Sequence, residues 1–250
     1  MKKSKKIFDL FIVLFDLTAE GCPILALNLI DELKKNKMEI LLLTFRDTNN
    51  ELLNEFKERK IDAMSYKLSS RGFYRYLKIL YYSFIFTKKY KPKSILCFPI
   101  GWHAFVAIGA KLGGLKNICT HAGNLAPNKT NSGYWKFRLL LKLGDRLTNR
   151  IICCSKYIEN SVVKNFRISG SKTTTIYNSF NENKFEFSKN FSLSSKIKNK
   201  EVINIGMVGR FESHKDQKSL IKSIKILKNR GVYTKLFLVG DGSLKNELIE

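Results

Sequence analysis

Short apolar runs alternate with longer amphipathic segments through the first 180 residues. The runs have the length of β-strands, and in the longer segments apolar residues recur at the spacing of a helix. This alternation predicts an α/β fold built on a doubly wound parallel sheet. Strands are expected at 7–15, 38–45, 94–99, 117–121, 150–154 and 173–177, and helices at 24–35, 50–60, 72–89, 103–112, 134–147 and 156–166.

The pattern changes at 181–200, where Asn, Lys and Ser are frequent and periodicity is weak. Such a composition is typical of a linker. Apolar order resumes at Val202. We therefore expect a first domain at 1–180, a linker at 181–200 and the start of a second domain at 201–250.

The second domain opens with a strand–helix–strand pattern. An apolar strand at 203–208 precedes a helix over 219–230, whose apolar residues share one face. Gly231 stands where a helix is expected to stop, and a second apolar strand follows at 235–239. Another helix is expected from Ser243. The pattern predicts two parallel strands joined by a helix.

Two cations occupy the connection between the first of these strands and its helix. Gly209 ends the strand, Arg210 follows at once, and Lys215 comes before the helix. Glycine lets the backbone approach a ligand closely, and a strand end beside a helix start is a common phosphate site in open α/β sheets. The segment therefore predicts binding of an anionic leaving group. The alternative is a surface turn with two solvated charges.

The run GMVGRFESHKDQ at 206–217, followed by LFLVGDG at 236–242, resembles the donor-binding half of family 4 retaining glycosyltransferases. The resemblance implies the GT-B fold, with two Rossmann-like doubly wound domains. The first would be the acceptor-side domain and the second the nucleotide-sugar domain. In the family the arginine and lysine of the G-R-x4-K pattern hold the donor diphosphate. The resemblance implies that Arg210 and Lys215 hold the diphosphate here. It also implies that both are catalytic residues.

Other family landmarks imply further donor contacts. The resemblance places Gly209, Gly240 and Asp241 at the nucleotide sugar. Gly21 stands where many members have a pair of glycines that opens the first helix near the diphosphate, and Glu20 replaces the first of the pair.

Two segments resemble the end of the family's first domain. These are 153–155, which leads into a helix, and 176–178, which is followed by Ser179 in place of the usual glycine.

His121 is the third candidate catalytic residue. It ends an expected strand and precedes a turn of small residues, a position that faces the ligand crevice of such sheets. In the family a histidine at this place lies beside the reacting sugar and contributes hydrogen bonds. The alternative is a core histidine bonded to the backbone. We expect His103 to serve packing and His214 to lie in an exposed turn.

The donor domain is expected to be incomplete. The family's E-x7-E signature, whose carboxylates meet the donor sugar and ribose, is absent from the sequence. Two strands are also too few for an independent sheet. We therefore expect the front part of a longer protein, inactive alone, and an inactive fragment is one alternative function.

The reaction implied by the resemblance is hexosyl transfer from a nucleotide diphosphate sugar to an acceptor hydroxyl, with retention of anomeric configuration. A UDP- or GDP-linked sugar would serve as co-substrate, no resident cofactor is expected, and the acceptor would be a saccharide or a lipid-linked saccharide. No metal site is predicted, because the diphosphate motif lacks a carboxylate cluster. A nucleotide-sugar epimerase of the same fold is an alternative, although the arginine–lysine pattern fits the transferase better.

The charge of the chain is strongly positive, with a formal net charge of +24. Such charge favours anionic substrates, an anionic membrane or nucleic acid, unless it reflects compositional drift toward lysine. The lysines are dispersed and no nucleic-acid motif is present, so a nucleic acid partner is not expected. A basic module that binds a membrane remains an alternative.

The five cysteines form no C-x-x-C pair, which favours a reducing cytoplasm over zinc or disulfides. Asp9 interrupts the first apolar run, which favours a buried strand over a signal peptide. No segment is long enough to span a bilayer. We expect a cytoplasmic protein, with peripheral attachment to the inner face of the cell membrane as a further possibility. The aromatic, basic segment 72–93 fits either a membrane interface or a buried crossover helix, and we favour burial.

Overall fold

The computed structural model describes residues 7–45, 51–66, 68, 73–98, 100–125, 127, 129–130, 132–180 and 202–249. The chain divides into two compact units, residues 1–184 and 185–250. The expected linker at 181–200 lies outside the described residues.

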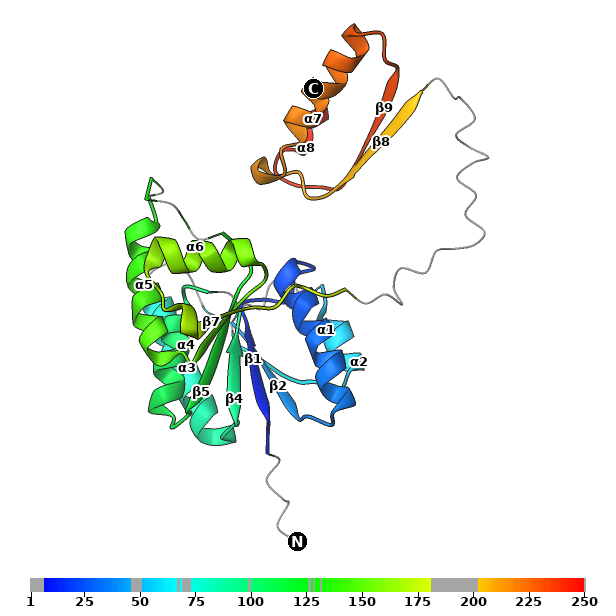
Figure 1. The fold of residues 1–250 in the computed structure, drawn as a ribbon. Coiled ribbons are helices and arrows are strands. Elements are labelled where there is room, and N and C mark those ends of the chain that lie inside the picture. The colour runs from blue at the N-terminus through cyan, green and yellow to red at the C-terminus, as the bar shows by residue number, and fades with distance from the viewer. Residues whose placement is uncertain are drawn as a thin grey trace. The chain divides into compact units, whose positions relative to one another are not determined.

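A seven-stranded parallel sheet forms the centre of the first unit (Figure 1). In space its strands follow the order β3-β2-β1-β4-β5-β6-β7. The doubly wound architecture expected from the sequence is therefore confirmed. The strands are β1 (Leu10–Leu14), β2 (Ile40–Thr44), β3 (Asp62–Ser65), β4 (Ser94–Cys97), β5 (Asn117–Ala122), β6 (Arg150–Cys153) and β7 (Thr173–Thr175).

Among the residues described, six α-helices cover the faces of this sheet. They are α1 (Gly21–Lys35), α2 (Leu53–Glu58), α3 (Phe73–Tyr90), α4 (His103–Leu112), α5 (Tyr134–Leu147) and α6 (Lys156–Phe166).

Side chains of the central strands alternate between two apolar layers. Phe11 of β1 packs with Ile79 of α3, whereas Ile12 packs with Ile30 of α1. Because helices cover both faces, every residue of β1 is buried, which is why the strand has an uninterrupted apolar sequence. The amino-terminal apolar run is thus a buried first strand, as expected.

Strand β3 was not predicted from the sequence. Three of its four residues are exposed, so it lacks the apolar alternation of a half-buried strand. It forms because its backbone pairs in parallel with β2 at the edge of the sheet. A short exposed edge strand is held mainly by main-chain hydrogen bonds, and these leave little trace in the sequence.

The segment 72–93, expected to be either a buried crossover helix or a membrane-interface helix, is only partly buried in α3. Ile79 and Phe86 are buried against the sheet, as expected of a crossover helix. Tyr74, Leu77 and Tyr81 nevertheless remain exposed. Among the described residues, no helix combines the length and apolar character needed to cross a bilayer.

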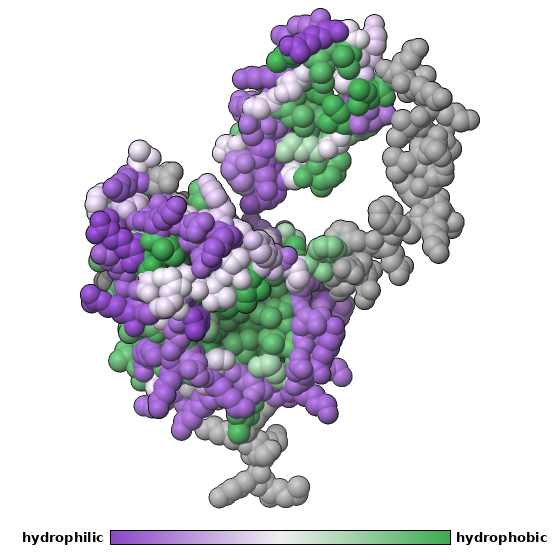
Figure 2. Space-filling view, viewed as in Figure 1, coloured by the Kyte–Doolittle hydropathy of each residue, from purple (hydrophilic) through white to green (hydrophobic). Residues whose placement is uncertain are grey.

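An apolar area interrupts the polar surface between α1 and α6 (Figure 2). Leu25 and Leu29 of α1, together with Ile152 and Ile176, line a cavity of about 170 Å³ in this region. This cavity also reaches His121.

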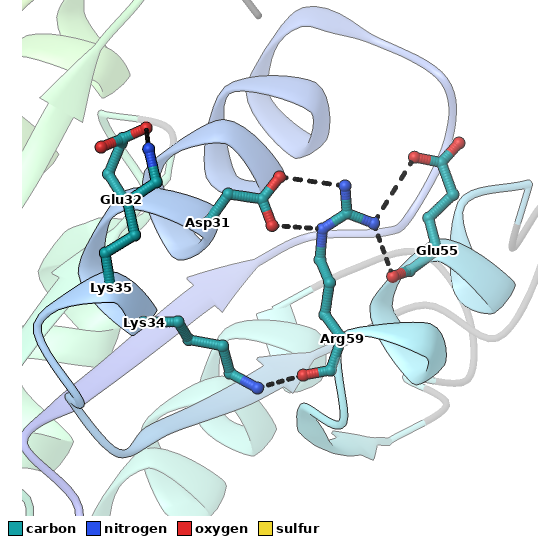
Figure 3. Close-up of polar contacts among 6 residues, drawn as sticks. All are labelled: Asp31, Glu32, Lys34, Lys35, Glu55 and Arg59. Carbon is teal, nitrogen blue, oxygen red and sulfur yellow. Dashed lines mark hydrogen bonds and ion pairs between the residues drawn. The ribbon is translucent and has the colours of Figure 1, made fainter. Parts of the chain in front are cut away.

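Arg59 fixes α2 against α1 (Figure 3). Its Nε and Nη2 atoms donate to the two carboxylate oxygens of Asp31 on α1, at 2.6 and 3.0 Å. Its Nη1 atom also donates to the Glu55 carbonyl oxygen at 2.8 Å. A guanidinium that engages both oxygens of one carboxylate restrains orientation as well as distance.

In the described part of the second unit, residues 202–249, two parallel strands, β8 (Ile203–Val208) and β9 (Thr234–Val239), lie with helices α7 (Gln217–Asn229) and α8 (Lys245–Ile249). A 3-10 turn, Ser213–Lys215, connects β8 to α7. This is the strand–helix–strand arrangement predicted from the sequence. His214 is exposed in that turn, as expected.

Candidate active site

A crevice opens where β1 and β4 lie side by side. From β1 the chain continues to β2 on one side, and from β4 it continues to β5 on the other. Ligands of open parallel sheets bind at such a switch point, outside the carboxyl ends of the strands. Helix α1 begins at this edge, directly after the β1 loop.

A cavity of about 490 Å³ occupies the crevice. Its walls combine aromatic side chains with charged and amide groups, which are Phe15, Phe98, Trp102, Asp16, Glu20, Arg75 and Asn124. Aromatic faces suit the apolar side of a sugar ring, while carboxylates and amides can bond its hydroxyls. The lining is therefore suited to a saccharide.

The start of α1 leaves room for a ligand. Glu20 is the N-cap residue, and its side chain makes no capping hydrogen bond. A Cβ atom on Gly21 would meet no other atom within 4 Å. Backbone N–H groups at a helix start attract anions, and the Glu20 side chain does not cap those of α1. The helix begins at Gly21, earlier than predicted, because Pro23 is tolerated in a first turn.

His121 lies beside the same crevice, at the end of β5. Its side chain is buried, and the ring centroid is 4.9 Å from that of Phe98, which lines both cavities. Burial lowers the pKa of His121 below its usual value, and the Asn178 side chain opposes that shift. Neither ring nitrogen has a hydrogen bond of ordinary geometry within the described residues. The hydrogen bond to the backbone that the alternative interpretation of His121 requires is therefore not seen among these residues.

Gly123 brings the His121 strand close to the start of α1. A Cβ atom on Gly123 would lie 3.0 Å from His121 Cε1 and 3.9 Å from Cys22 Sγ. The sequence showed only that small residues follow His121. The structure shows that Gly123 lies where the end of β5 and the start of α1 come next to each other.

Gly209 and Gly240 meet at the carboxyl ends of β8 and β9. The Gly209 N–H donates to the Val239 carbonyl oxygen at 2.9 Å. A Cβ atom on Gly240 would lie only 2.0 Å from the Gly209 carbonyl oxygen, and Gly240 has a φ of +155°. A Cβ atom on Gly209 would meet nothing within 4 Å. Gly240 is therefore required by packing, whereas Gly209 leaves open space.

The backbone on both sides of Arg210 is fixed. Gln217, a buried residue of α7, donates from Nε2 to the Arg210 carbonyl oxygen at 2.8 Å. The next residue, Phe211, is buried, and its N–H donates to the Asp241 carbonyl oxygen at 2.9 Å. Arg210 and Lys215 are themselves exposed on this turn. Sequence reasoning missed the role of Gln217, which is a polar residue two positions before the predicted start of the helix.

Asp241 holds its own turn together. Its carboxylate accepts a hydrogen bond from the Gly242 N–H at 2.8 Å and lies 3.4 Å from Lys245 Nζ. The Gly242 hydrogen bond, with help from Lys245, lowers the pKa of Asp241. Glu212, which was not predicted, accepts from the Ser243 hydroxyl at 3.1 Å and so ties the Arg210 loop to the same turn.

The predicted residues thus form two groups. Gly21 and His121 flank the crevice of the first unit, and Gly209, Arg210, Lys215, Gly240 and Asp241 lie at one edge of the second. Among the residues that the structure describes, no three His, Cys, Asp or Glu side chains are grouped to hold a metal ion.

Solved structures of GT-B proteins share this fold. HepE from Anabaena, in complex with UDP and glucose, superposes with a TM-score of 0.71 at 17% identity, over 96% of this chain and 63% of that chain. The lipopolysaccharide outer core galactosyltransferase WaaB gives a TM-score of 0.68 at 16% identity, over 97% and 63%. A UDP-N-acetylglucosamine 2-epimerase from Rickettsia bellii gives 0.59 at 14%, over 98% and 65%.

The chain therefore has the GT-B α/β fold and spans 63% of the length of HepE and of WaaB. The comparison with curated proteins found no match. The sequence model described as Glycosyltransferase Family 4 matches residues 20–184, which is more than half of the chain. The protein belongs to glycosyltransferase family 4.

Proposed function

We propose that this chain forms the acceptor-side domain and the start of the donor-binding domain of a retaining hexosyltransferase. The donor would be a UDP- or GDP-linked sugar, and the acceptor a hydroxyl of a saccharide or lipid-linked saccharide. The observation that carries the proposal is the turn after β8. Its backbone is fixed by Gln217 and Phe211 while the side chains of Arg210 and Lys215 stay exposed.

Arg210 and Lys215 would neutralise the charge that grows on the departing diphosphate. Positioned charges act most strongly when they need not reorganise during the reaction. The hydrogen bonds that fix this loop supply such rigidity. The open space at Gly209 would let a phosphate approach the main chain.

His121 would contribute hydrogen bonds beside the reacting sugar. Its lowered pKa keeps the imidazole neutral near pH 7, so one ring nitrogen donates and the other accepts. Both nitrogens lack an ordinary hydrogen bond among the described residues, and the ring lines a cavity. A neutral ring of this kind can bond a sugar hydroxyl without adding charge to the site.

Two comparisons bear on the donor and on the reaction class. The HepE crystals hold UDP and glucose, which supports UDP as the nucleotide here. The similarity to an epimerase keeps epimerisation as a second candidate, since a shared fold alone does not distinguish glycosyl transfer from epimerisation. The nucleotide sugar is proposed as a co-substrate, with no resident cofactor or metal.

We further infer a cytoplasmic location, with peripheral attachment to the inner face of the cell membrane. All five cysteines are free thiols, as is usual in a reducing compartment. The strongly positive charge favours an anionic surface.

Product analysis tests the proposal. The protein that carries this chain would be incubated with a UDP-hexose and a panel of saccharide acceptors, and the products followed by proton NMR. We expect a new glycosidic bond with the anomeric configuration of the donor. Conversion of the free nucleotide sugar to an epimer, without transfer, would favour the second candidate. Inversion of configuration would contradict the proposed retention.

A further inference from the structure

The outer face of α5 carries three large apolar side chains in a line. Trp135, Leu139 and Leu143 are 68%, 69% and 41% exposed, and their spacing places them on one side of the helix. Single exposed apolar residues are common on protein surfaces, but an ordered row of this kind marks an interaction face.

The charged residues on this face are all basic. The other exposed residues of α5 are Lys136, Lys142 and Arg146. The one acidic residue of the helix, Asp145, is only 21% exposed and lies 3.4 Å from Lys172 Nζ. The exposed face of α5 therefore combines apolar anchors with cations and presents no exposed carboxylate.

The basic and aromatic character continues from α5 onto α3. The Nζ atom of Lys136 lies 5.2 Å from the ring centroid of Tyr76 on α3. Tyr74 and Leu77 are exposed near the same end of α3. Residues 73–93 contain no Asp or Glu.

We propose that the outer face of α5 docks on an anionic bilayer surface. Helices that lie in a membrane interface combine Trp and Leu with Lys and Arg in this way, and Trp favours the level of the headgroups. Lysine is depleted from the cores of protein interfaces, so the charge fits lipid better than a protein partner. The inference rests on the membrane attachment proposed above, and it does not depend on the proposed transfer reaction.

Vesicle co-sedimentation of the full chain tests the proposal. Vesicles of phosphatidylcholine alone are compared with vesicles of equal parts phosphatidylglycerol and phosphatidylcholine. We expect binding to the anionic vesicles only, and a loss of binding as salt rises, because exposed charges are screened over about 10 Å at 0.1 M salt.

Matched substitutions distinguish docking through α5 from a general electrostatic attraction of the basic protein to anionic vesicles. Lys142→Glu and Lys164→Glu change the net charge equally, but Lys164 lies on α6. Trp135→Ser is paired with Tyr157→Ser, since the two side chains are 68% and 70% exposed. We expect Lys142→Glu and Trp135→Ser each to weaken binding about fivefold or more, and the two controls to leave it nearly unchanged.

Three results would overturn the proposal. One is equal weakening by Lys142→Glu and Lys164→Glu with no effect of Trp135→Ser, which would leave only diffuse lysine attraction. Another is the absence of binding to anionic vesicles. The third is self-association that Trp135→Ser abolishes when no vesicles are present, which would identify a second copy of the chain as the occupant. Circular dichroism of each variant confirms that the fold is retained.

Discussion

Gly144 and His103 are in contact at the crossing of α5 and α4. A Cβ atom on Gly144 would lie 2.3 Å from His103 Nε2. His103 is buried, and its Nδ1 atom accepts a hydrogen bond from the Gly101 N–H at 2.9 Å. The imidazole therefore cannot move away without losing that bond. The packing role expected for His103 is confirmed, and its partner is a glycine.

Gly144→Ala should destabilise the first unit by about 1–3 kcal/mol, because overpacking forces side chains or backbone to shift. Gly170→Ala is the matched control, since a Cβ atom there would meet nothing within 4 Å. Chemical denaturation of both variants measures the difference. Equal stabilities would show that α4 and α5 separate easily.

The stability of the folded chain should decrease as the pH is lowered, because of His103. Burial lowers the pKa of His103 to about 4 in the folded state, below the usual 6.5. Between these values the unfolded chain binds the proton more readily, so stability is complete above pH 6.5 and is lost as pH falls toward 4. The loss reaches roughly 3 kcal/mol.

Comparison with His103→Asn isolates this contribution to the pH dependence. His121, whose pKa is also lowered by burial, contributes in the same direction and remains in the variant. Denaturation midpoints should therefore depend less steeply on pH in His103→Asn than in the wild type between pH 6.5 and 4.5. Parallel pH profiles would argue against a neutral buried His103.

The two glycines at the ends of β8 and β9 should respond differently to alanine. Gly240→Ala should destabilise the second unit by about 1–3 kcal/mol, because the new Cβ atom would meet the Gly209 carbonyl oxygen. Gly209→Ala should keep the fold but weaken UDP binding roughly tenfold, by filling the space where a phosphate would approach. Calorimetric titration with UDP and thermal denaturation measure the two effects. If Gly209→Ala binds UDP normally, the main chain there is not part of the donor site.

Lys215→Ala should reduce the transfer rate by roughly 10²–10³ without changing stability, because it removes one positioned charge from the leaving group. Lys222→Ala is the control for charge, since Lys222 is an exposed residue of α7. The rates are measured with the complete protein that carries this chain. A variant that folds correctly and keeps its rate would remove Lys215 from the proposed machinery.

Elements with strong periodic signals were predicted closely. The bounds of α4, α5 and α6 match the sequence-based ranges, because each is an uninterrupted run that favours a helix, and in α5 and α6 the apolar residues gather on one side. Ser155 caps α6, for example, by accepting a hydrogen bond from the Ile158 N–H. Strand β3 was missed because backbone pairing at a sheet edge requires no apolar pattern.

The candidate site could be predicted only where one segment carries the chemistry. The loop around Arg210 and Lys215 is local in sequence, so its pattern is readable. The crevice of the first unit is assembled from distant segments. Arg75 of α3 and Trp102 before α4 reach the cavity through packing between elements, which no single segment encodes.

The position of β1 in the sheet has a consequence for synthesis of the chain. Leu10 pairs with Ile40 on one side and with Ser94 on the other, so β1 gains its second neighbour only after β4 emerges. At 5–20 residues per second, roughly 4–17 s pass between the synthesis of the two strands. During that interval a wholly apolar strand has one open edge. Folding of this sheet is therefore governed by non-local pairing, and a nascent chain in this state is a substrate for chaperones.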